Sequence, residues 1–315
     1  MIVELPLISI VVPVFNEEAN ILPFYEAVTT AIQPLTGRFG FELVFTDNHS
    51  TDATFPLLRD LSKRDPRVRA YRFSRNFGYQ RSIMTGYCKA RGVAAVQLDV
   101  DLQDPPELIA RFIEEWQNGA DVVYGVRIKR QESWFINLQR VFFYRLINNL
   151  SEDPLPLDAG DFRLISRRII DLLASFDDAQ PYLRGTIATL GFQQIGIPYE
   201  RNPRLRGQSK FPFAKLVSLA IDGILNHSVV PLRLATYFGL SVSVLTLLGV
   251  IGYASAKLLL YSEWPAGFAT IATLILAGIS INAMLLGIIG EYLGRMYQQI
   301  RKRPLTIIEE SAGPV

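Results

Sequence analysis

The chain is poor in the residues that build most metal clusters and disulfide frameworks. Its 315 residues include one cysteine, Cys88, and two histidines, His49 and His227, which lie far apart. A single cysteine excludes an internal disulfide framework and a cysteine-rich metal cluster, and the histidines lack metal-ligand spacing. The formal net charge of +2 provides no bulk attraction to nucleic acid. We therefore expect no metal cluster of this kind and no nucleic-acid partner.

Two common phosphate-binding patterns are also absent. Neither G-x-x-x-x-G-K-[ST] nor G-x-G-x-x-G occurs in the chain. Their absence argues against a P-loop hydrolase and against a dinucleotide dehydrogenase. The N-terminus lacks a cleavable signal pattern, because its apolar run, residues 5–14, is short and contains Pro6 and Pro13.

The most informative stretch is residues 98–107, which read LDVDLQDPPE. An apolar, strand-like run at residues 92–98 ends in Asp99 and Asp101, two carboxylates one residue apart. Hard divalent cations take oxygen ligands, typically one or two carboxylates together with substrate phosphates. A lone D-x-D is common in solvated turns, but the strand before it and the Pro-Pro turn after it favour a metal–nucleotide site.

Strands alternate with helices along the first hundred residues. This alternation predicts an α/β fold with a mainly parallel sheet. In such open sheets ligands bind outside the carboxyl ends of the strands, and polar residues follow each of the four predicted strands. We expect these residues to converge on a nucleotide diphosphate. The predicted strands are residues 7–12, 41–45, 68–73 and 92–98, the polar ends are 13–17, 47–52, 74–76 and 99–104, and the predicted helices are 16–33, 53–63 and 80–91.

Two long runs near the C-terminus, residues 234–256 and 264–290, carry no charged side chain. Each exceeds the roughly 20 apolar residues that a membrane-spanning helix needs. Basic residues flank the pair on its outer sides, whereas the connecting loop around residues 261–265 holds Glu263 and no arginine. We therefore expect an integral membrane protein with a two-helix hairpin, its catalytic domain and both termini being cytoplasmic. The small residues Gly278, Ser280 and Gly287 would allow association of copies of the chain.

With these residues placed, the chain resembles family 2 of the inverting glycosyltransferases. Within that family the polyprenyl-phosphate glycosyltransferases look most similar, the group that includes dolichol-phosphate mannosyltransferase and the bacterial undecaprenyl-phosphate glucosyltransferases. The resemblance implies a GT-A, Rossmann-like fold, a nucleotide-sugar donor, a Mg²⁺ or Mn²⁺ ion and a lipid-phosphate acceptor. The motifs that carry it are VVPVFNEE (11–18), TDNHSTDAT (46–54), SRNFG (74–78), LDVDLQDPPE (98–107), VYGVR (123–127), GDFRLISR (160–167) and RGQSK (206–210).

The same resemblance implies roles for individual residues. Asp99 and Asp101 would hold the metal, with Asp101 its firmest ligand. The second loop often reads D-D-G-S in the family, whereas here Asp47 is followed by Asn48 and His49, so a nucleotide contact at Asn48 is left open. The residues that match nucleotide-sugar contacts are Pro13, Phe15, Glu17, Asp47, Asp99 and Gln103.

For catalysis, the negative charge of the acceptor phosphate has to be neutralised and its attacking oxygen oriented, whereas a general base is of little use. A phosphate monoester with a second pKa of about 6 is largely dianionic at neutral pH, and guanidinium groups bind phosphate bidentately. Asp161 is the candidate catalytic carboxylate, orienting or deprotonating the acceptor, and a salt bridge to Arg163 or Arg167 is its structural alternative. The candidate acceptor-phosphate ligands are Arg127, Arg130, Arg206, Ser209 and Lys210.

We interpret the chain as an enzyme that transfers one sugar from a nucleotide sugar to polyprenyl phosphate, with UDP-glucose as the preferred donor. GDP-mannose and UDP-aminoarabinose are alternative donors. A processive polysaccharide synthase is disfavoured because Q-x-x-R-W is missing, and an inert nucleotide-sugar sensor is disfavoured because the three carboxylates are intact. The expected domains are a catalytic domain at 1–210, an amphipathic juxtamembrane segment at 211–232, the transmembrane hairpin at 233–293 and a tail at 294–315.

Overall fold

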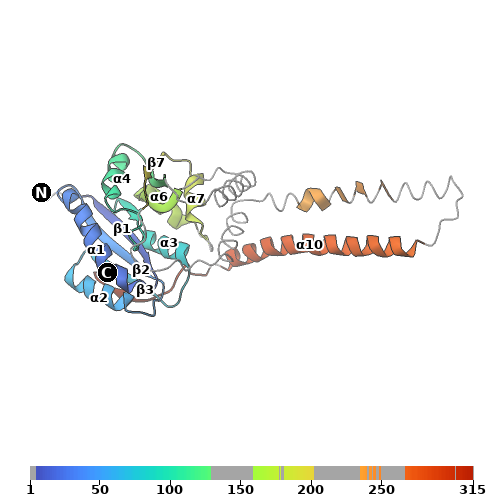
Figure 1. Cartoon of the computed structure of the whole chain (residues 1–315), viewed down its shortest axis with the longest axis horizontal. Coiled ribbons are helices and arrows are strands. Elements are labelled where there is room, and N and C mark those ends of the chain that lie inside the picture. Colours follow the sequence, from blue (N-terminus) through green and yellow to red (C-terminus); the bar gives the residue numbers. More distant parts are fainter. Residues whose placement is uncertain are drawn as a thin grey trace.

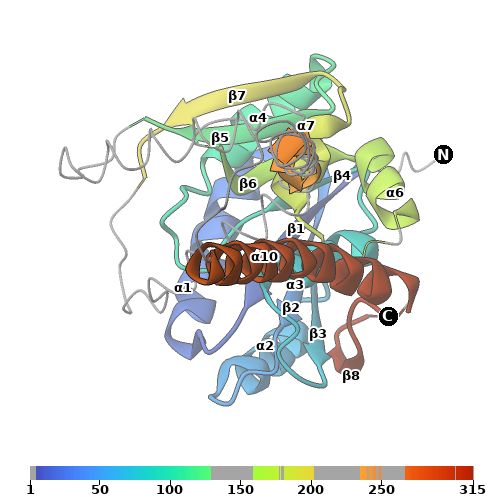
Figure 2. The ribbon, with the colours of Figure 1, turned by 90° about the vertical axis from the view of Figure 1, so that its right-hand side faces the viewer.

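The strands of the chain form one eight-stranded sheet in the order β7-β5-β6-β4-β1-β2-β3-β8, with helices packed on it (Figures 1 and 2). The computed structural model describes residues 5–128, 159–176, 178, 181–201, 235–239, 241–242, 244–245, 248–249, 267–301 and 303–314. The strands are β1 (Leu7–Val14), β2 (Gly40–Asp47), β3 (Val68–Phe73), β4 (Ala94–Gln97), β5 (Val122–Arg127), β6 (Ala159–Ser166), β7 (Gln194–Tyr199) and β8 (Ile308–Ala312). The helices are α1 (Glu18–Ile32), α2 (Thr54–Arg64), α3 (Tyr79–Lys89), α4 (Leu108–Gln117), α6 (Arg167–Ser175), α7 (Leu183–Thr189) and α10 (Phe268–Ile300), with a 3-10 turn at Gln33–Leu35.

Strand β1 is apolar except for Ser9 because helices cover the sheet on both faces. Successive strand residues point to opposite faces, and both sets are buried here. Ile10 and Val12 pack in a cluster with α1, α2 and α4, whereas Val11 packs in a second cluster with α3, α6 and α7. Helix α3 packs closely on β1 at Gly86. A Cβ atom at this position would lie only 2.3 Å from the Val11 Cγ1 atom, so a larger residue would not fit.

Four parallel strands form the centre of the sheet, as the sequence predicts. Strand β1 pairs in parallel with both β2 and β4, and β2 pairs in parallel with β3. Their carboxyl ends therefore meet at one edge of the sheet. The predicted strands and helices of the first hundred residues are confirmed within a few residues of their expected bounds.

The other half of the sheet is mixed rather than mainly parallel. Strand β6 runs antiparallel between β4 and β5, while β7 runs parallel to β5. A hydrophobic period does not reveal strand direction, which is why the sequence pattern missed this reversal. The reversal matters for the site, because the register pairs Gln97 with Arg163. It brings the beginning of β6, with Asp161, next to the end of β4, with Asp99.

The end of the chain returns to the sheet. Helix α10 extends away from the sheet (Figure 1), and β8 then pairs antiparallel with β3. The Ser74 amide donates to the Ile307 carbonyl at 2.9 Å, and the Thr85 and Thr306 hydroxyl groups lie 2.8 Å apart. The expected division of the chain at residues 210, 232 and 293 stays a prediction, but part of the expected tail is a strand of the sheet.

The expected membrane hairpin is corrected by the structure. The charge-free run 264–290 lies mostly in α10, which continues past it through Glu291 to Ile300. In the described part of the chain, no helix is both long and apolar enough to count as a candidate membrane span. Most of the run 234–256 lies outside the described residues. For the described residues, the prediction of an integral membrane protein with two spans and cytoplasmic termini is therefore wrong.

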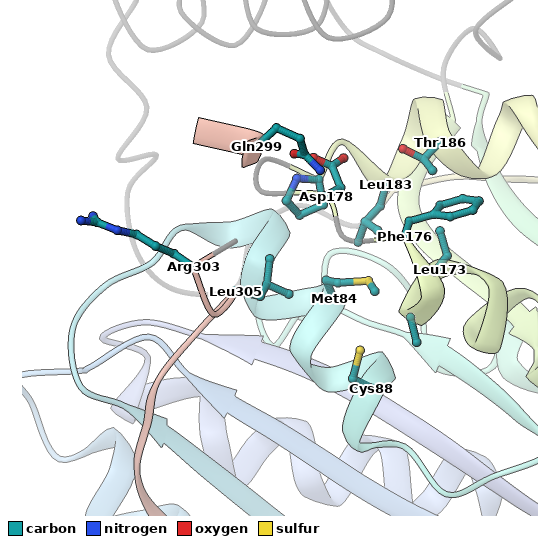
Figure 3. A pocket seen from close by; sticks show the side chains of 12 residues that line it. Met84, Cys88, Leu173, Phe176, Asp178, Leu183, Thr186, Gln299, Arg303 and Leu305 are labelled. Atoms are coloured by element: carbon teal, nitrogen blue, oxygen red, sulfur yellow. The ribbon is translucent and has the colours of Figure 1, made fainter. Parts of the chain in front are cut away.

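A pocket lies between α3, α6, α7 and the segment that follows α10 (Figure 3). Its walls include the apolar side chains Met84, Leu173, Phe176 and Leu305, and Arg303 points away from it (Figure 3). None of the described residues that the sequence predicts for the site lines this pocket. The pocket lies where the C-terminal segment packs against the core cluster formed with α3, α6 and α7, which Leu305 also contacts.

A buried ion pair links β2 to β3 at the sheet edge opposite the strand carboxyl ends. The Arg69 guanidinium donates to Glu42 Oε2 at 2.7 Å, and both side chains are only 7% exposed. Glu42 Oε1 accepts hydrogen bonds from the Ser9 hydroxyl and from the Arg91 amide, each at 2.6 Å. One carboxylate thus connects three strands with the loop before β4.

We predict that Glu42→Gln strongly destabilises the full chain. The substitution removes the charge that compensates buried Arg69, and breaking one partner of a buried pair costs about 3–5 kcal/mol. Urea unfolding measures the loss. Asp60→Asn is the matched control, because Asp60 pairs with Lys63 at an exposed site on α2 and should leave the midpoint nearly unchanged. Equal midpoints for the two variants would contradict the role assigned to Glu42.

Candidate functional site

The loops after β1 and β2 are joined by hydrogen bonds. The Asn16 amide donates to Ser50 Oγ at 2.9 Å, and the Thr51 amide donates to Asn16 Oδ1 at 2.8 Å. Asn16 adopts a φ of 54°, a left-handed conformation that asparagine tolerates better than most residues. The first loop therefore has a defined position over the end of β2.

Asn48 joins the second loop to the third. Its Oδ1 accepts a hydrogen bond from the Phe77 amide at 3.0 Å, and its Nδ2 donates to the Gly78 carbonyl at 3.2 Å. These two bonds give Asn48 a structural role between the loops. The expected convergence of the strand ends is confirmed for these three loops.

Asp47 lies at the end of β2 and is fully buried. Its Oδ1 accepts hydrogen bonds from the Ser50 amide and hydroxyl, at 3.1 and 2.5 Å. Its Oδ2 has no hydrogen-bond partner among the described residues. Burial raises the pKa of Asp47, although the Ser50 hydrogen bonds oppose this rise. A buried acceptor without a donor is costly, so this oxygen is suited to a donor group on a ligand.

Asp99 and Asp101 follow β4 and differ in their surroundings. Asp99 Oδ1 accepts a hydrogen bond from the Tyr79 hydroxyl at 2.6 Å and another from Gln97 Nε2 at 2.9 Å. Asp101 is buried, and its Oδ1 accepts a bond from the Gln103 amide at 3.2 Å. Burial raises the pKa of Asp99 to about 7; the Tyr79 bond lowers it, and neighbouring carboxylates raise it further.

These two carboxylates fit a divalent cation. The raised pKa of Asp99 reflects a surplus of negative charge in a buried place, which a bound cation would offset. The described residues contain no group of three or more His, Cys, Asp or Glu side chains placed to hold a metal ion. The remaining ligands would have to be water and substrate oxygens, as is usual for Mg²⁺.

Asp161 pairs with an arginine that the sequence analysis did not consider. Arg184, on α7, donates Nε to Asp161 Oδ1 at 2.9 Å and Nη2 to Oδ2 at 2.6 Å. Neither expected alternative is present, because Arg163 donates to the Gly160 carbonyl and Arg167 pairs with Asp171. Burial alone would raise the pKa of Asp161, but the charge and hydrogen bonds of Arg184 outweigh burial and lower it.

Asp104 is the centre of a second buried cluster. It accepts a short hydrogen bond from the Tyr199 hydroxyl, and its oxygens lie 3.7 Å from Arg127 Nη2 and 3.3 Å from Arg201 Nε. Arg127 also donates Nε to the Tyr199 hydroxyl oxygen at 3.2 Å. Burial followed by the Asp104 charge raises the pKa of Tyr199 to about 12. Arg127 is therefore held in place by neighbours before any ligand arrives.

The other predicted site residues divide into two groups. Pro13 is part of β1, Phe15 is 38% exposed just after it, and Glu17 accepts a hydrogen bond from Asn20 at 2.5 Å. Gln103 is half-buried beside Asp101. Outside the described residues lie Arg130, Arg206, Ser209 and Lys210.

Sequence reasoning missed Tyr79, Arg184 and the Asp104 cluster. Tyr79 directly follows the SRNFG stretch and begins α3, so its position after a strand-end motif was a usable signal. Arg184 lies on a short helix outside every quoted motif, and no local pattern connects it to Asp161. Only the folded chain brings that pair together.

A comparison with protein families settles the classification. The family model described as "Glycosyl transferase family 2" matches residues 9–173. The chain belongs to this family. The expected GT-A type of domain and the expected glycosyltransferase class are thereby confirmed.

This family 2 glycosyltransferase has relatives that match nearly its whole length. It is 39% identical to the uncharacterised glycosyltransferase YkcC of Bacillus subtilis over 97% of this chain and 94% of the relative. It is 36% identical to an SfII prophage-derived bactoprenol glucosyl transferase of Shigella flexneri over 96% of this chain and 98% of the relative. A solved glucosyl-3-phosphoglycerate synthase from Mycobacterium tuberculosis is 20% identical, with a TM-score of 0.48 over 70% of this chain and 78% of that one.

We predict that Arg184→Gln makes the activity of this glycosyltransferase depend on pH in the neutral range. Without Arg184, burial dominates and the pKa of Asp161 rises, so the ionised form is lost at higher pH than in the wild type. A buried charge without its partner is costly, and kcat/KM should fall at least about ten-fold at pH 7 and recover as the pH rises. A pH profile of kcat/KM measures the change.

Arg168→Gln is the control for this substitution. Arg168 lies on α6, where its guanidinium stacks on the Phe192 ring at 4.4 Å. Its replacement should leave the pH profile in place. An unchanged acid limb in Arg184→Gln would show that Asp161 does not depend on Arg184.

Proposed function

We propose that this glycosyltransferase transfers one glucose from UDP-glucose to polyprenyl phosphate and forms polyprenyl-phosphate glucose. The observation that carries the proposal is the 36% identity, over nearly the full length of both chains, to a bactoprenol glucosyl transferase. The site supports the same reaction, because carboxylates and a buried unpaired acceptor lie at the carboxyl ends of parallel strands, where such folds bind ligands.

In the proposed reaction an oxygen of the lipid phosphate attacks the anomeric carbon of glucose. The new bond to this oxygen forms while the bond from the anomeric carbon to UDP breaks, with inversion. The phosphate is largely dianionic at neutral pH because its second pKa is about 6. It therefore needs no strong base, and Asp161, whose pKa is lowered, acts in this proposal by orienting the acceptor.

The nucleotide sugar would bind across the first, second and fourth strand-end loops. Pro13, Phe15 and Glu17 would surround the base and ribose, and Asp47 Oδ2 would accept a hydrogen bond from the base. Gln103 would contact the donor from the loop after β4. This assignment is supported by the hydrogen bonds that join the first loop to the second and by the bond from the Gln103 amide to Asp101 within the fourth loop.

Asp99 and Asp101 would hold a Mg²⁺ or Mn²⁺ ion together with the diphosphate of the donor. When bound, such an ion acts as a Lewis acid that stabilises the charge developing on the leaving diphosphate. Tyr79 and Gln97 fix the orientation of Asp99 by donating to its Oδ1. Both bonds leave the second carboxylate oxygen of Asp99 for the ion.

Basic residues would neutralise the acceptor phosphate. Arg127 supports this role best, because Asp104 and Tyr199 hold its guanidinium in position while its charge is retained. Guanidinium groups match the oxygens of a phosphate in pairs. The further candidates for this role are Arg130, Arg206, Ser209 and Lys210.

We predict that the purified full chain transfers labelled glucose from UDP-glucose to undecaprenyl phosphate dispersed in detergent. The reaction is followed by counting the label in an organic extract. UDP-glucose, GDP-mannose and UDP-aminoarabinose are tested in parallel. Label from GDP-mannose or UDP-aminoarabinose alone would replace the proposed donor, and label in a long polymer would contradict single transfer. A lack of transfer from all three would contradict the proposed reaction.

We predict that Asp101→Asn lowers kcat at least about a hundred-fold, as does loss of one electrostatic contact to a developing charge in other enzymes. EDTA should abolish wild-type transfer, and added Mn²⁺ or Mg²⁺ should restore it. Manganese binding in the presence of UDP, measured by electron paramagnetic resonance, should weaken in the variant. Asp171→Asn, which alters an exposed pair with Arg167, is the control and should retain activity. Full activity in EDTA would exclude the proposed role of the ion.

A further inference from the structure

The C-terminal strand β8 places one acidic residue beside the loop that contains Asp47. Glu309 Oε2 lies 3.7 Å from Arg72 Nε and 3.4 Å from His49 Nδ1. Arg72 is the register partner of Asp47 in the pairing of β2 with β3, and His49 follows Asp47 by two residues. Glu309 therefore contacts both the β3 residue that pairs in register with Asp47 and a residue of the loop that follows Asp47.

Two buried atoms of register-paired residues in this region have no hydrogen-bond partner among the described residues. They are Arg72 Nε and Asp47 Oδ2, a donor and an acceptor of opposite charge. Such a pair would normally join, because a buried charged group gains most from a charged partner. The structure instead keeps the two groups apart.

Three contacts hold the Arg72 side chain in its observed position. Its Nη2 donates to the Ser50 carbonyl at 3.2 Å, and its guanidinium lies 5.4 Å from the centre of the Phe55 ring. Glu309 supplies the third contact and is the only one of the three that carries a negative charge. Without that charge, Asp47 would be the strongest attraction for the guanidinium.

We propose that Glu309 is a positioning residue of the nucleotide site, which holds Arg72 away from Asp47 so that Asp47 Oδ2 remains available to the base. The proposal rests on the function proposed above and adds the C-terminal strand to the nucleotide site. The ligand group that it requires is a ring N–H, which uracil and guanine both carry. Removal of the Glu309 charge lets Arg72 turn to Asp47 and occupy the acceptor.

The test compares Glu309→Gln with Glu310→Gln in the full chain. Glu310 is the next residue of β8, but it pairs with Arg59 on α2 at 2.5 Å and has no contact with the nucleotide loop in the described structure. UDP binding is measured by calorimetry, and KM and kcat are measured with UDP-glucose. Glu309→Gln should weaken UDP binding and raise KM about ten-fold, the effect of losing one hydrogen bond to a charged group, with kcat within about two-fold. Glu310→Gln should change neither.

A second pair of variants separates positioning from a general loss of structure. In an Arg72→Met background there is no guanidinium to occupy Asp47, so adding Glu309→Gln should cause no further loss of UDP affinity. Glu309→Asp retains the charge and should recover part of the wild-type affinity. Equal behaviour of Glu309→Gln and Glu310→Gln, or an equal ten-fold loss in both the native and the Arg72→Met backgrounds, would overturn the proposal.

The wild-type measurements distinguish failure of this inference from failure of the proposed function. If the wild type binds GDP and not UDP, the proposed donor is wrong, and the same variants are compared with GDP. If the wild type binds either nucleotide and Glu309→Gln binds it as tightly, only the role of Glu309 is wrong. If the wild type binds neither, both conclusions fall.

Discussion

Parallel pairing of the four central strands is the constraint on which the whole site depends. The registers that pair Val14 with Asp47, and Asp47 with Arg72, set the heights at which the strands end. Each loop then begins within reach of its neighbour, so a few side-chain bonds are enough to join them. Asn16 and Asn48 provide these bonds. The strand registers therefore set where the polar residues at the strand ends meet, and Asp47 and Arg72, at the ends of β2 and β3, contact the second loop directly.

The carboxylates of the site differ in whether an arginine compensates their charge. Asp161 is paired with one arginine, and Asp104 lies within 4 Å of two, so both carboxylates have their charge compensated within the protein. Among the described residues, Asp99 receives hydrogen bonds from the neutral Tyr79 and Gln97 side chains, and burial and the neighbouring carboxylates raise its pKa to about 7. The excess negative potential is thus concentrated at the turn after β4. Arg127, which is held by the Asp104 cluster, keeps a positive charge a short distance away. A ligand with separate cationic and anionic parts meets complementary charge at both places.

Local sequence patterns predicted the elements in which neighbouring residues are buried in the same way along the whole element. Strand β1 is buried on both faces, so its run of apolar residues, broken by Ser9 alone, identified it, and the strand-end positions of Asp47 and Asp99 followed from the same argument. The pairing of Asp161 with Arg184 joins residues from β6 and α7, and no period in either segment encodes it. The antiparallel direction of β6 was missed for a similar reason. At the C-terminal helix, the sequence predicted a feature that the structure does not support. The absence of charged residues was interpreted as a membrane span, but the described helix does not qualify as one.

The pairing of β8 with β3 has a consequence for how the chain reaches its native state. Residues 68–73 leave the ribosome long before residues 308–312, so the backbone groups along the outer side of β3 wait unpaired during most of synthesis. An uncovered strand edge is a template for pairing with another chain. Arg72 on this strand carries a charge, which discourages such pairing; when β8 arrives, Glu309 contacts Arg72 and Glu310 pairs with Arg59 on α2. Pairing of β8 with β3 is therefore a late, long-range step, and we expect it to be slow. Until it occurs, the open edge of β3 exposes the nascent domain to aggregation.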